Sequence, residues 1–193
     1  HPDVAGLPAP LADITRTPRR YGFHATLKPP FALAEGVGPD RLLRAVHALA
    51  ARVPAFAAPP LMLAREHGFA SLRLSAPSPA MTALAAEAVS ALDAFRAPAS
   101  PADLARRRAA PLGAEAEANL ARWGYPWVMD LFSFHLTLSG ALAPDALDRT
   151  CAALAPLVAP FCAEALPVRE ICVFGDPGGD APFRLLARAP LGG

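Results

Sequence analysis

The chain has 193 residues, of which 53% are hydrophobic, and its mean hydropathy is +0.29. This composition allows a sizeable core and excludes a disordered or highly charged chain. Eighteen basic residues against seventeen acidic ones leave a formal charge of +1, which argues against a surface that binds nucleic acid by charge alone. Any recognition of phosphate must come from a local site. Apolar stretches end well before the roughly 20 residues of a membrane span, so we expect no membrane helix.

The predicted elements follow one another in two similar series, separated by a polar connector. Residues 1–18 predict an irregular, proline-containing lead-in. Period-two alternation predicts strands over 21–28, 61–63, 69–74, 130–139, 168–174 and 183–189. Helical spacing of apolar residues predicts helices over 40–53, 79–95 and 145–157, with shorter helical pieces over 101–108 and 114–123.

The two series echo each other, which predicts two similar α+β lobes facing each other in a single bilobed domain over residues 1–193. We expect the first lobe at about residues 19–96 and the second at about 129–190. The connector spans about 97–128.

One five-residue string is repeated at the start of each series. Phe-His-Ala-Thr-Leu at 23–27 reappears as Phe-His-Leu-Thr-Leu at 134–138. Alternation along a strand places His24 and Thr26 on one face and the apolar residues on the other, and it does the same for His135 and Thr137. We expect the apolar faces to pack on helices of the same lobe. Each polar face then presents an imidazole and a hydroxyl roughly 7 Å apart.

Two such faces across a cleft suit the in-line cleavage of a phosphodiester. A neutral imidazole can take a proton from water or a hydroxyl, while a protonated imidazole on the other side donates to the leaving oxygen. The threonine hydroxyls would bind the non-bridging phosphoryl oxygens. This chemistry needs no metal or other cofactor. Either histidine can be the base, because the arrangement is pseudo-symmetric.

Two H-x-T motifs in a two-lobed α+β chain resemble the 2H phosphoesterase superfamily, which includes 2′,3′-cyclic phosphodiesterases and 2′-5′ RNA ligase-like proteins. The longer strings Arg-Arg-Tyr-Gly-Phe-His-Ala-Thr-Leu-Lys-Pro-Pro-Phe (19–31) and Arg-Trp-Gly-Tyr-Pro (122–126), the latter ahead of the second motif, are similar to its DUF1045 branch. Members of that branch are typically encoded beside bacterial phosphonate-utilisation genes. The resemblance covers essentially the whole chain.

The resemblance implies two lobes around a central cleft, each an antiparallel sheet flanked by helices, with His24 and His135 catalytic and Thr26 and Thr137 binding substrate. Members usually begin with another strand ahead of the proline-rich lead-in, and its absence here leaves the exact sheet order open. Arg20 and Lys28 fall on the His24 face and would add positive charge at the cleft mouth, with solvated charge as the alternative.

We therefore expect a metal-independent enzyme that hydrolyses a small cyclic phosphodiester, a phosphorylated sugar or nucleotide-like molecule linked to phosphonate metabolism. The alternatives are an RNA-end 2′,3′-cyclic phosphodiesterase or ligase-like enzyme, and a module that binds a nucleotide or phosphosugar without turnover. We expect no cofactor, no stable nucleic-acid complex and no membrane partner; the oligomeric state stays open. Three cysteines without metal-type spacing predict reduced thiols in a bacterial cytoplasmic protein.

The aromatic residues ahead of the second motif have two interpretations. Trp123, Tyr125 and Trp127 either pack the connector or form a wall that stacks on a substrate ring.

Overall fold

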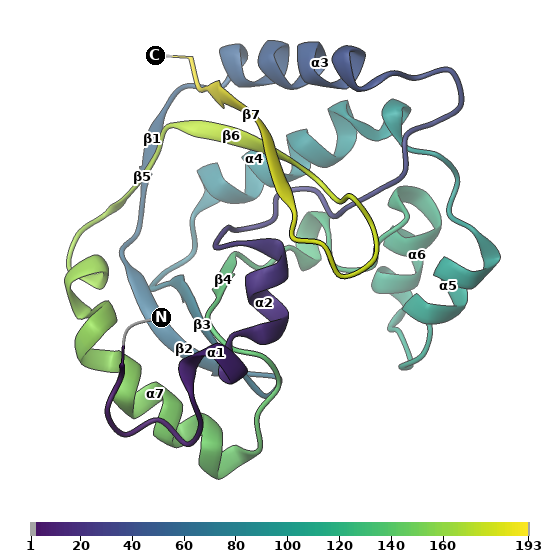
Figure 1. The fold of residues 1–193 in the computed structure, drawn as a ribbon. Coiled ribbons are helices and arrows are strands. Elements are labelled where there is room, and N and C mark those ends of the chain that lie inside the picture. The colour runs from purple at the N-terminus through teal and green to yellow at the C-terminus, as the bar shows by residue number, and fades with distance from the viewer. Residues whose placement is uncertain (1–2, 193) are drawn as a thin grey trace.

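The structure is a computed structural model that describes residues 3–192. Figure 1 shows helices and strands intermixed along the chain. The α-helices are α1 (Leu11–Ile14), α2 (Arg16–Tyr21), α3 (Pro39–Arg52), α4 (Pro79–Ala91), α5 (Pro101–Arg107), α6 (Ala114–Trp123) and α7 (Pro144–Val158). The strands are β1 (Phe56–Ala58), β2 (Leu61–Glu66), β3 (Phe69–Leu74), β4 (His135–Thr137), β5 (Leu166–Val168), β6 (Glu170–Gly175) and β7 (Arg184–Pro190). Short 3-10 turns are η1 (Asp93–Phe95), η2 (Met129–Leu131) and η3 (Ala159–Cys162).

The strands form three small sheets, and the pairs within them are antiparallel. One sheet has the order β2-β3-β4, a second is the hairpin β6-β7, and a third pairs β1 with β5. The prediction of an α+β chain with antiparallel sheets is therefore confirmed. Within residues 3–192, no helix has both the length and the apolar character needed to cross a membrane.

Helix α7 covers one face of the β2-β3-β4 sheet. Ala70 on β3 packs with Leu147 and Cys151 of α7, and Leu63 and Leu138 lie against this cluster. Figure 1 shows α7 running alongside β2 and β3. Because neighbouring side chains on a strand point to opposite faces, this packing fixes which residues of the sheet point away from α7.

The C-terminal hairpin β6-β7 packs on helices from the first half of the chain. Leu49 of α3, Leu84 of α4, Ile171 of β6 and Ala189 of β7 share one buried cluster. Figure 1 shows β7 crossing close to α3, with β6 above α4. The last two strands of the chain thus contribute side chains to this buried cluster.

Strand pairing does not follow the two halves of the sequence. β4, from the second half, pairs with β3 from the first, and β1 pairs with β5. The expectation that each half forms its own sheet is wrong for these pairs. Strands β1 and β5 were not predicted, because each has three residues and Pro167 interrupts the alternation that marks a strand.

The predicted helices are confirmed with small shifts at their ends. The ranges 40–53, 79–95 and 145–157 correspond to α3, to α4 with η1, and to α7. Each of these three helices begins with proline in its first turn, where the missing N–H costs no hydrogen bond. At α4, the Ser78 hydroxyl also accepts a hydrogen bond from the Met81 amide at 3.3 Å.

The strand predicted over residues 21–28 is wrong. The irregular lead-in predicted over 1–18 is confirmed for residues 3–10, which form no helix or strand, and is wrong for most of residues 11–18. Helices α1 and α2 occupy most of residues 11–21, and the segment from Gly22 to Lys28 pairs with no described strand. Alternation specifies which way side chains point but not whether a partner strand is available. Residues 1 and 2 of the lead-in lie outside the described residues.

The strand predicted over residues 130–139 is shorter than expected. It begins at His135: residues 129–131 form the turn η2, in which Met129 has a positive φ of 55°, and residues 132–134 belong to no helix or strand. Hydrogen bonds to Ala70 continue the contact with β3 beyond β4: the Leu138 amide donates to the Ala70 carbonyl at 2.8 Å, and the Ala70 amide donates to the Ser139 hydroxyl at 2.9 Å.

Candidate active site

The first His–Thr pair (His24 and Thr26) lies in the irregular segment that follows α2. His24 Nδ1 lies 3.1 Å from the carbonyl oxygen of Gly22, and His24 Nε2 lies 3.1 Å from Thr26 Oγ1. A carbonyl can only accept, so Nδ1 carries the proton in this contact. In the neutral ring, Nε2 then accepts a hydrogen bond from the Thr26 hydroxyl. The ring also stacks on Phe174 of β6, with centroids 5.1 Å apart and planes inclined by 28°.

The second His–Thr pair (His135 and Thr137) lies on β4. His135 Nδ1 lies 2.8 Å from the carbonyl oxygen of Ser133, again two residues upstream. Both imidazoles therefore donate Nδ1–H to the carbonyl at position −2. In each neutral ring the lone pair is on Nε2, the atom that would transfer a proton, and in the first pair this atom accepts from the Thr26 hydroxyl. His135 is exposed and Thr137 is half-buried.

The register of the sheet assigns the second pair to the face away from α7. Leu138 packs into the α7 cluster, and Leu136 shares its face by parity. His135 and Thr137 therefore point to the other face. In the antiparallel register, Arg73 of β3 stands opposite His135, and Ser71 stands opposite Thr137.

Backbone hydrogen bonds place helices α1 and α2, which precede the segment that carries His24, next to the residues that flank β4 and β7. The Gly140 amide, just beyond β4, donates to the Ile14 carbonyl of α1 at 2.7 Å. The Phe183 amide, just before β7, donates to the Arg20 carbonyl of α2 at 2.8 Å. Among the described residues, no hydrogen bond or ring contact joins the first His–Thr pair to the second.

Arg20 connects α2 to the loop between β6 and β7. Its Nη2 donates to Asp176 Oδ1 at 2.9 Å, and its guanidinium lies over the rings of Tyr21 and Phe183 at 5.6 and 5.3 Å from their centroids. The buried Nε of Arg20 has no hydrogen-bond partner in the described part of the chain. This placement gives Arg20 a structural contact that the sequence did not indicate.

Lys28 lies in a buried charge cluster. Its side chain is 7% exposed, and its Nζ donates to the Val89 carbonyl at 3.1 Å and lies 3.5 Å from Asp93 Oδ1. Burial lowers the pKa of Lys28 below its ordinary value of 10.5, and the Asp93 carboxylate offsets part of this effect. Burial alone would raise the pKa of Asp93, but the hydrogen bond and charge of Arg96, together with Lys28, hold it below 3.8. An ammonium already paired with a carboxylate favours a structural role for Lys28.

The apolar side of the first motif packs only in part. Leu27 lies against the large core cluster, whereas Phe23 is 66% exposed. The expectation that the whole apolar face packs on helices is therefore wrong at Phe23. The reason is that residues 22–28 are not held flat in a sheet.

The aromatic residues before the second motif divide between the two interpretations. Trp123 and Tyr125 line a small recess with Lys28, and the guanidinium of Arg107 lies 4.4 Å from the Tyr125 ring centroid. Tyr125 therefore packs within the connector, whereas Trp123 stays open to both interpretations. Trp127 is 52% exposed and stays available for either role.

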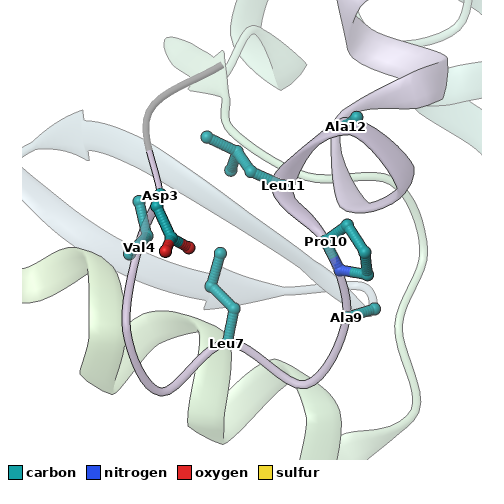
Figure 2. Close-up of a pocket in the computed structure, with 7 residues that line it drawn as sticks. All are labelled: Asp3, Val4, Leu7, Ala9, Pro10, Leu11 and Ala12. Carbon is teal, nitrogen blue, oxygen red and sulfur yellow. The ribbon is translucent and has the colours of Figure 1, made fainter.

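A hollow of about 530 Å³ lies elsewhere, inside the N-terminal loop (Figure 2). Asp3, Val4, Leu7, Ala9, Pro10, Leu11 and Ala12 line it. Its lining includes neither His–Thr pair. Over residues 3–192, no group of three or more His, Cys, Asp or Glu side chains is arranged to hold a metal ion.

Sequence reasoning missed Arg73, which shares a face with His135. Its side chain pairs with the carboxylate of Glu66 and donates to the hydroxyl of Ser133. The one signal in the sequence was a charged residue near the end of a mostly apolar strand, a pattern that usually indicates a solvated position.

Comparison with known proteins assigns the family. Residues 26–184 match the family model described as "Protein of unknown function (DUF1045)". The chain belongs to the DUF1045 family. The family resemblance drawn from the sequence strings is thereby confirmed at this level.

Two curated relatives carry the same name, "Ribose 1,5-bisphosphate phosphokinase PhnN". The relative from Janthinobacterium sp. (strain Marseille) is 34% identical over 99% of this chain and 43% of its own length. The relative from Laribacter hongkongensis (strain HLHK9) is 37% identical over 94% of this chain and 42% of its own length. The chain thus spans less than half the length of these relatives.

Proposed function

We propose that this DUF1045 chain is a metal-independent phosphoesterase of the 2H type that opens a small cyclic phosphodiester. The observation that carries the proposal is the shared geometry of the two motifs. In both, the imidazole donates Nδ1–H to the carbonyl two residues upstream, and a threonine follows two residues downstream. The two lobes and their central cleft are part of the same proposal.

In this mechanism the phosphorus lies between the two His–Thr pairs. One imidazole accepts a proton through Nε2 from the attacking water, and the other, protonated, donates from Nε2 to the leaving sugar oxygen. One P–O bond forms and one breaks, and the product is a phosphomonoester with a free hydroxyl. Thr137 donates to a non-bridging oxygen as charge develops on it, and Thr26 does the same once its hydroxyl turns from His24 Nε2 toward the phosphate.

The substrate we propose is a phosphorylated ribose or nucleotide-like molecule, linked to phosphonate metabolism. The relatives are named for a ribose that carries two phosphates. Opening a cyclic phosphodiester on a ribose that already bears a phosphate yields a ribose bisphosphate. The proposed hydrolysis would therefore produce the class of compound named in the relatives.

A kinase activity for this chain is not supported by its own residues. A P-loop needs a Gly-Lys pair at the end of a glycine-rich loop, so that the lysine reaches the phosphates. The single lysine of this chain, Lys28, follows Leu27, and its amine pairs with Asp93. We therefore propose hydrolysis rather than phosphate transfer from a nucleotide.

The proposal is tested by turnover of a panel of cyclic phosphodiesters, including ribose cyclic phosphates, 2′,3′-cyclic nucleotides and RNA with a cyclic end, in the presence of a chelator. His24→Ala and His135→Ala should each lower kcat by roughly 100-fold or more. His47→Ala, on the exposed side of α3, is the matched control and should keep full activity.

Turnover against pH should be bell-shaped, because one imidazole must be neutral while the other is charged. No turnover of any compound in the panel, or histidine variants as active as the control, would overturn the proposal. Preference for RNA ends would instead select the RNA-processing alternative.

A further inference from the structure

Arg73 is the charged side chain placed closest in register to His135. It stands directly opposite His135 across the β3-β4 ladder, and β-carbons of such pairs are about 4.5–5.5 Å apart. Both side chains project from the face away from α7, as shown above for β4 and as Ala70 and Leu72 require for β3. Arg73 therefore lies on the surface that presents the second His–Thr pair.

The guanidinium of Arg73 is held in place by two neighbours. Its Nη1 pairs with the Glu66 carboxylate, and its Nη2 donates to the Ser133 hydroxyl. Ser133 is also the residue whose carbonyl accepts from His135 Nδ1. Arg73, Ser133 and His135 therefore form one connected group, in which the arginine and the imidazole share a single anchor.

Arg73 keeps donors that these contacts do not use. A guanidinium has five N–H groups, and Glu66 and Ser133 each accept from one nitrogen. The side chain is 31% exposed, so the remaining donors can reach a ligand on the His135 face. Glu66 balances the charge, so the arginine acts here through directed hydrogen bonds rather than through net charge.

We propose that Arg73 binds the phosphate oxygens of the ligand beside His135, with Ser133 holding both side chains in register. This assignment deepens the proposed phosphoesterase function and rests on it. It places an arginine fork beside the imidazole on one side of the phosphorus. Loss of the fork weakens phosphate binding, and lysine does not replace it, because an ammonium cannot donate two parallel hydrogen bonds from a fixed plane.

The sheet offers a matched control arginine. Arg65 of β2 lies opposite Ala70, on the face that packs against α7, and its Nη1 lies 3.2 Å from Asp148 Oδ1. Arg65→Gln removes an ion pair from the same sheet, like Arg73→Gln. It does so on the opposite face, away from His135.

The experiment is a titration of the chain with inorganic phosphate, following the ring resonances of His135 by NMR, with the His135→Ala variant used for assignment. Wild type and Arg65→Gln should show the same saturable shift. Arg73→Gln should raise the Kd for phosphate by roughly 10-fold or more, and Arg73→Lys should not restore it. Thermal unfolding shows whether each variant is folded. If Arg73→Gln is unfolded, the phosphate affinity of Arg73→Lys alone tests whether Arg73 binds phosphate.

Equal phosphate affinity in wild type and both Arg73 variants would overturn the assignment, as would a wild-type His135 ring that phosphate leaves unmoved. The outcome is separate from that of the proposed function. If phosphate binding depends on Arg73 but no cyclic phosphodiester is turned over, the proposed phosphoesterase activity is wrong and the phosphate-binding role of Arg73 stands. If turnover requires His135 but Arg73→Gln changes neither KM nor kcat, the phosphoesterase activity stands and the phosphate-binding role of Arg73 is wrong.

Discussion

The two His–Thr pairs share a motif but are held by different parts of the fold. His135 and Thr137 lie on β4, where backbone pairing with β3 fixes their direction. His24 and Thr26 lie in a segment that joins no sheet, and the stack of His24 on Phe174 and the contact with Thr26 hold the ring instead. The Nδ1–carbonyl contact is nevertheless the same in both.

This comparison separates what the short motif specifies from what the surroundings specify. The contact between His Nδ1 and the carbonyl at position −2 forms with and without a strand, so it belongs to the motif itself. The position of each pair is fixed by the residues around it, which are β3 for the second pair and Phe174 for the first. We therefore expect the first pair to be more sensitive to substitutions around it than the second.

The largest effect after loss of a histidine is expected at Gly22, whose carbonyl accepts from His24. Gly22 has φ 78° and ψ 170°, a combination that residues other than glycine rarely adopt. A β-carbon there meets no atom within 4 Å, so Gly22→Ala introduces backbone strain rather than a clash. We expect a loss of about 1–3 kcal/mol in unfolding free energy. Turnover should fall by roughly 100-fold as His24 shifts.

Gly36→Ala is the matched control for this prediction. Gly36 also has a positive φ, 74°, and it lies in the loop before α3, where an added β-carbon likewise meets no atom within 4 Å. The variant should lose stability but keep turnover. Equal turnover in the two variants would show that the first pair does not depend on its glycine.

The next effect is expected at the two threonines. Thr137→Val should lower turnover by roughly 10-fold through loss of one hydrogen bond to a charged oxygen. Thr26→Val should lower it further, because Thr26 also contacts His24 Nε2. Steady-state kinetics of both variants measure the difference, and serine at either position should restore most of the activity. A larger loss at Thr137 than at Thr26 would contradict the comparison.

A smaller effect is expected at Phe174, which stacks on His24. Phe174→Leu keeps an apolar side chain but removes the ring contact, and such contacts contribute about 0.5–1.5 kcal/mol. We expect turnover to fall a few-fold and the unfolding free energy to fall by no more than this amount. Phe161→Leu, at an exposed aromatic residue in η3, should change neither. Identical kinetics for the two variants would show that the Phe174 ring does not help to position His24.

The smallest effect on turnover is expected at the Lys28 cluster, where the change is in the dependence of stability on pH. The folded pKa of Asp93 is below its ordinary 3.8, so its ionised form stabilises the fold above that pH, and this contribution is lost as pH falls through the lowered value. The unfolding free energy should therefore fall below about pH 4. Asp93→Asn should flatten this slope and cost about 1–3 kcal/mol at neutral pH, because Lys28 and Arg96 lose their carboxylate. An unchanged slope, measured by urea unfolding, would contradict the assignment.

Lys28 contributes with the opposite sign. Its folded pKa is lowered from 10.5, so the unfolded chain binds the proton more tightly, and stability rises as pH increases from the lowered value toward 10.5. Lys28→Met should abolish this alkaline rise.

Much of the secondary structure followed from local patterns. The α3, α4 and α7 helices and the β3, β6 and β7 strands were predicted because their apolar spacing is regular, whereas β2 was predicted only over 61–63, half of its length. The segment over residues 22–28 has equally clear alternation but no partner strand, and pairing depends on residues far away in the sequence. β1 and β5, with three residues each, carry too little pattern to be detected.

The candidate site was predictable only where the sequence repeats itself. His24, Thr26, His135 and Thr137 were selected because one string occurs twice. Arg73 was missed, since its link to His135 exists only through the β3-β4 register. The pairing of Lys28 with Asp93 is likewise a tertiary contact, which strand parity at Lys28 could not reveal.

The most direct test of the central claim is whether one phosphate contacts both His–Thr pairs. Titration of the chain with inorganic phosphate, with the His24 and His135 ring resonances followed together by NMR, makes this measurement. We expect the ring resonances of His24 and His135 to shift with one common Kd for phosphate, and we expect His135→Ala to weaken the shift at His24. Two different dissociation constants, or a His24 response unaffected by the loss of His135, would contradict a shared site.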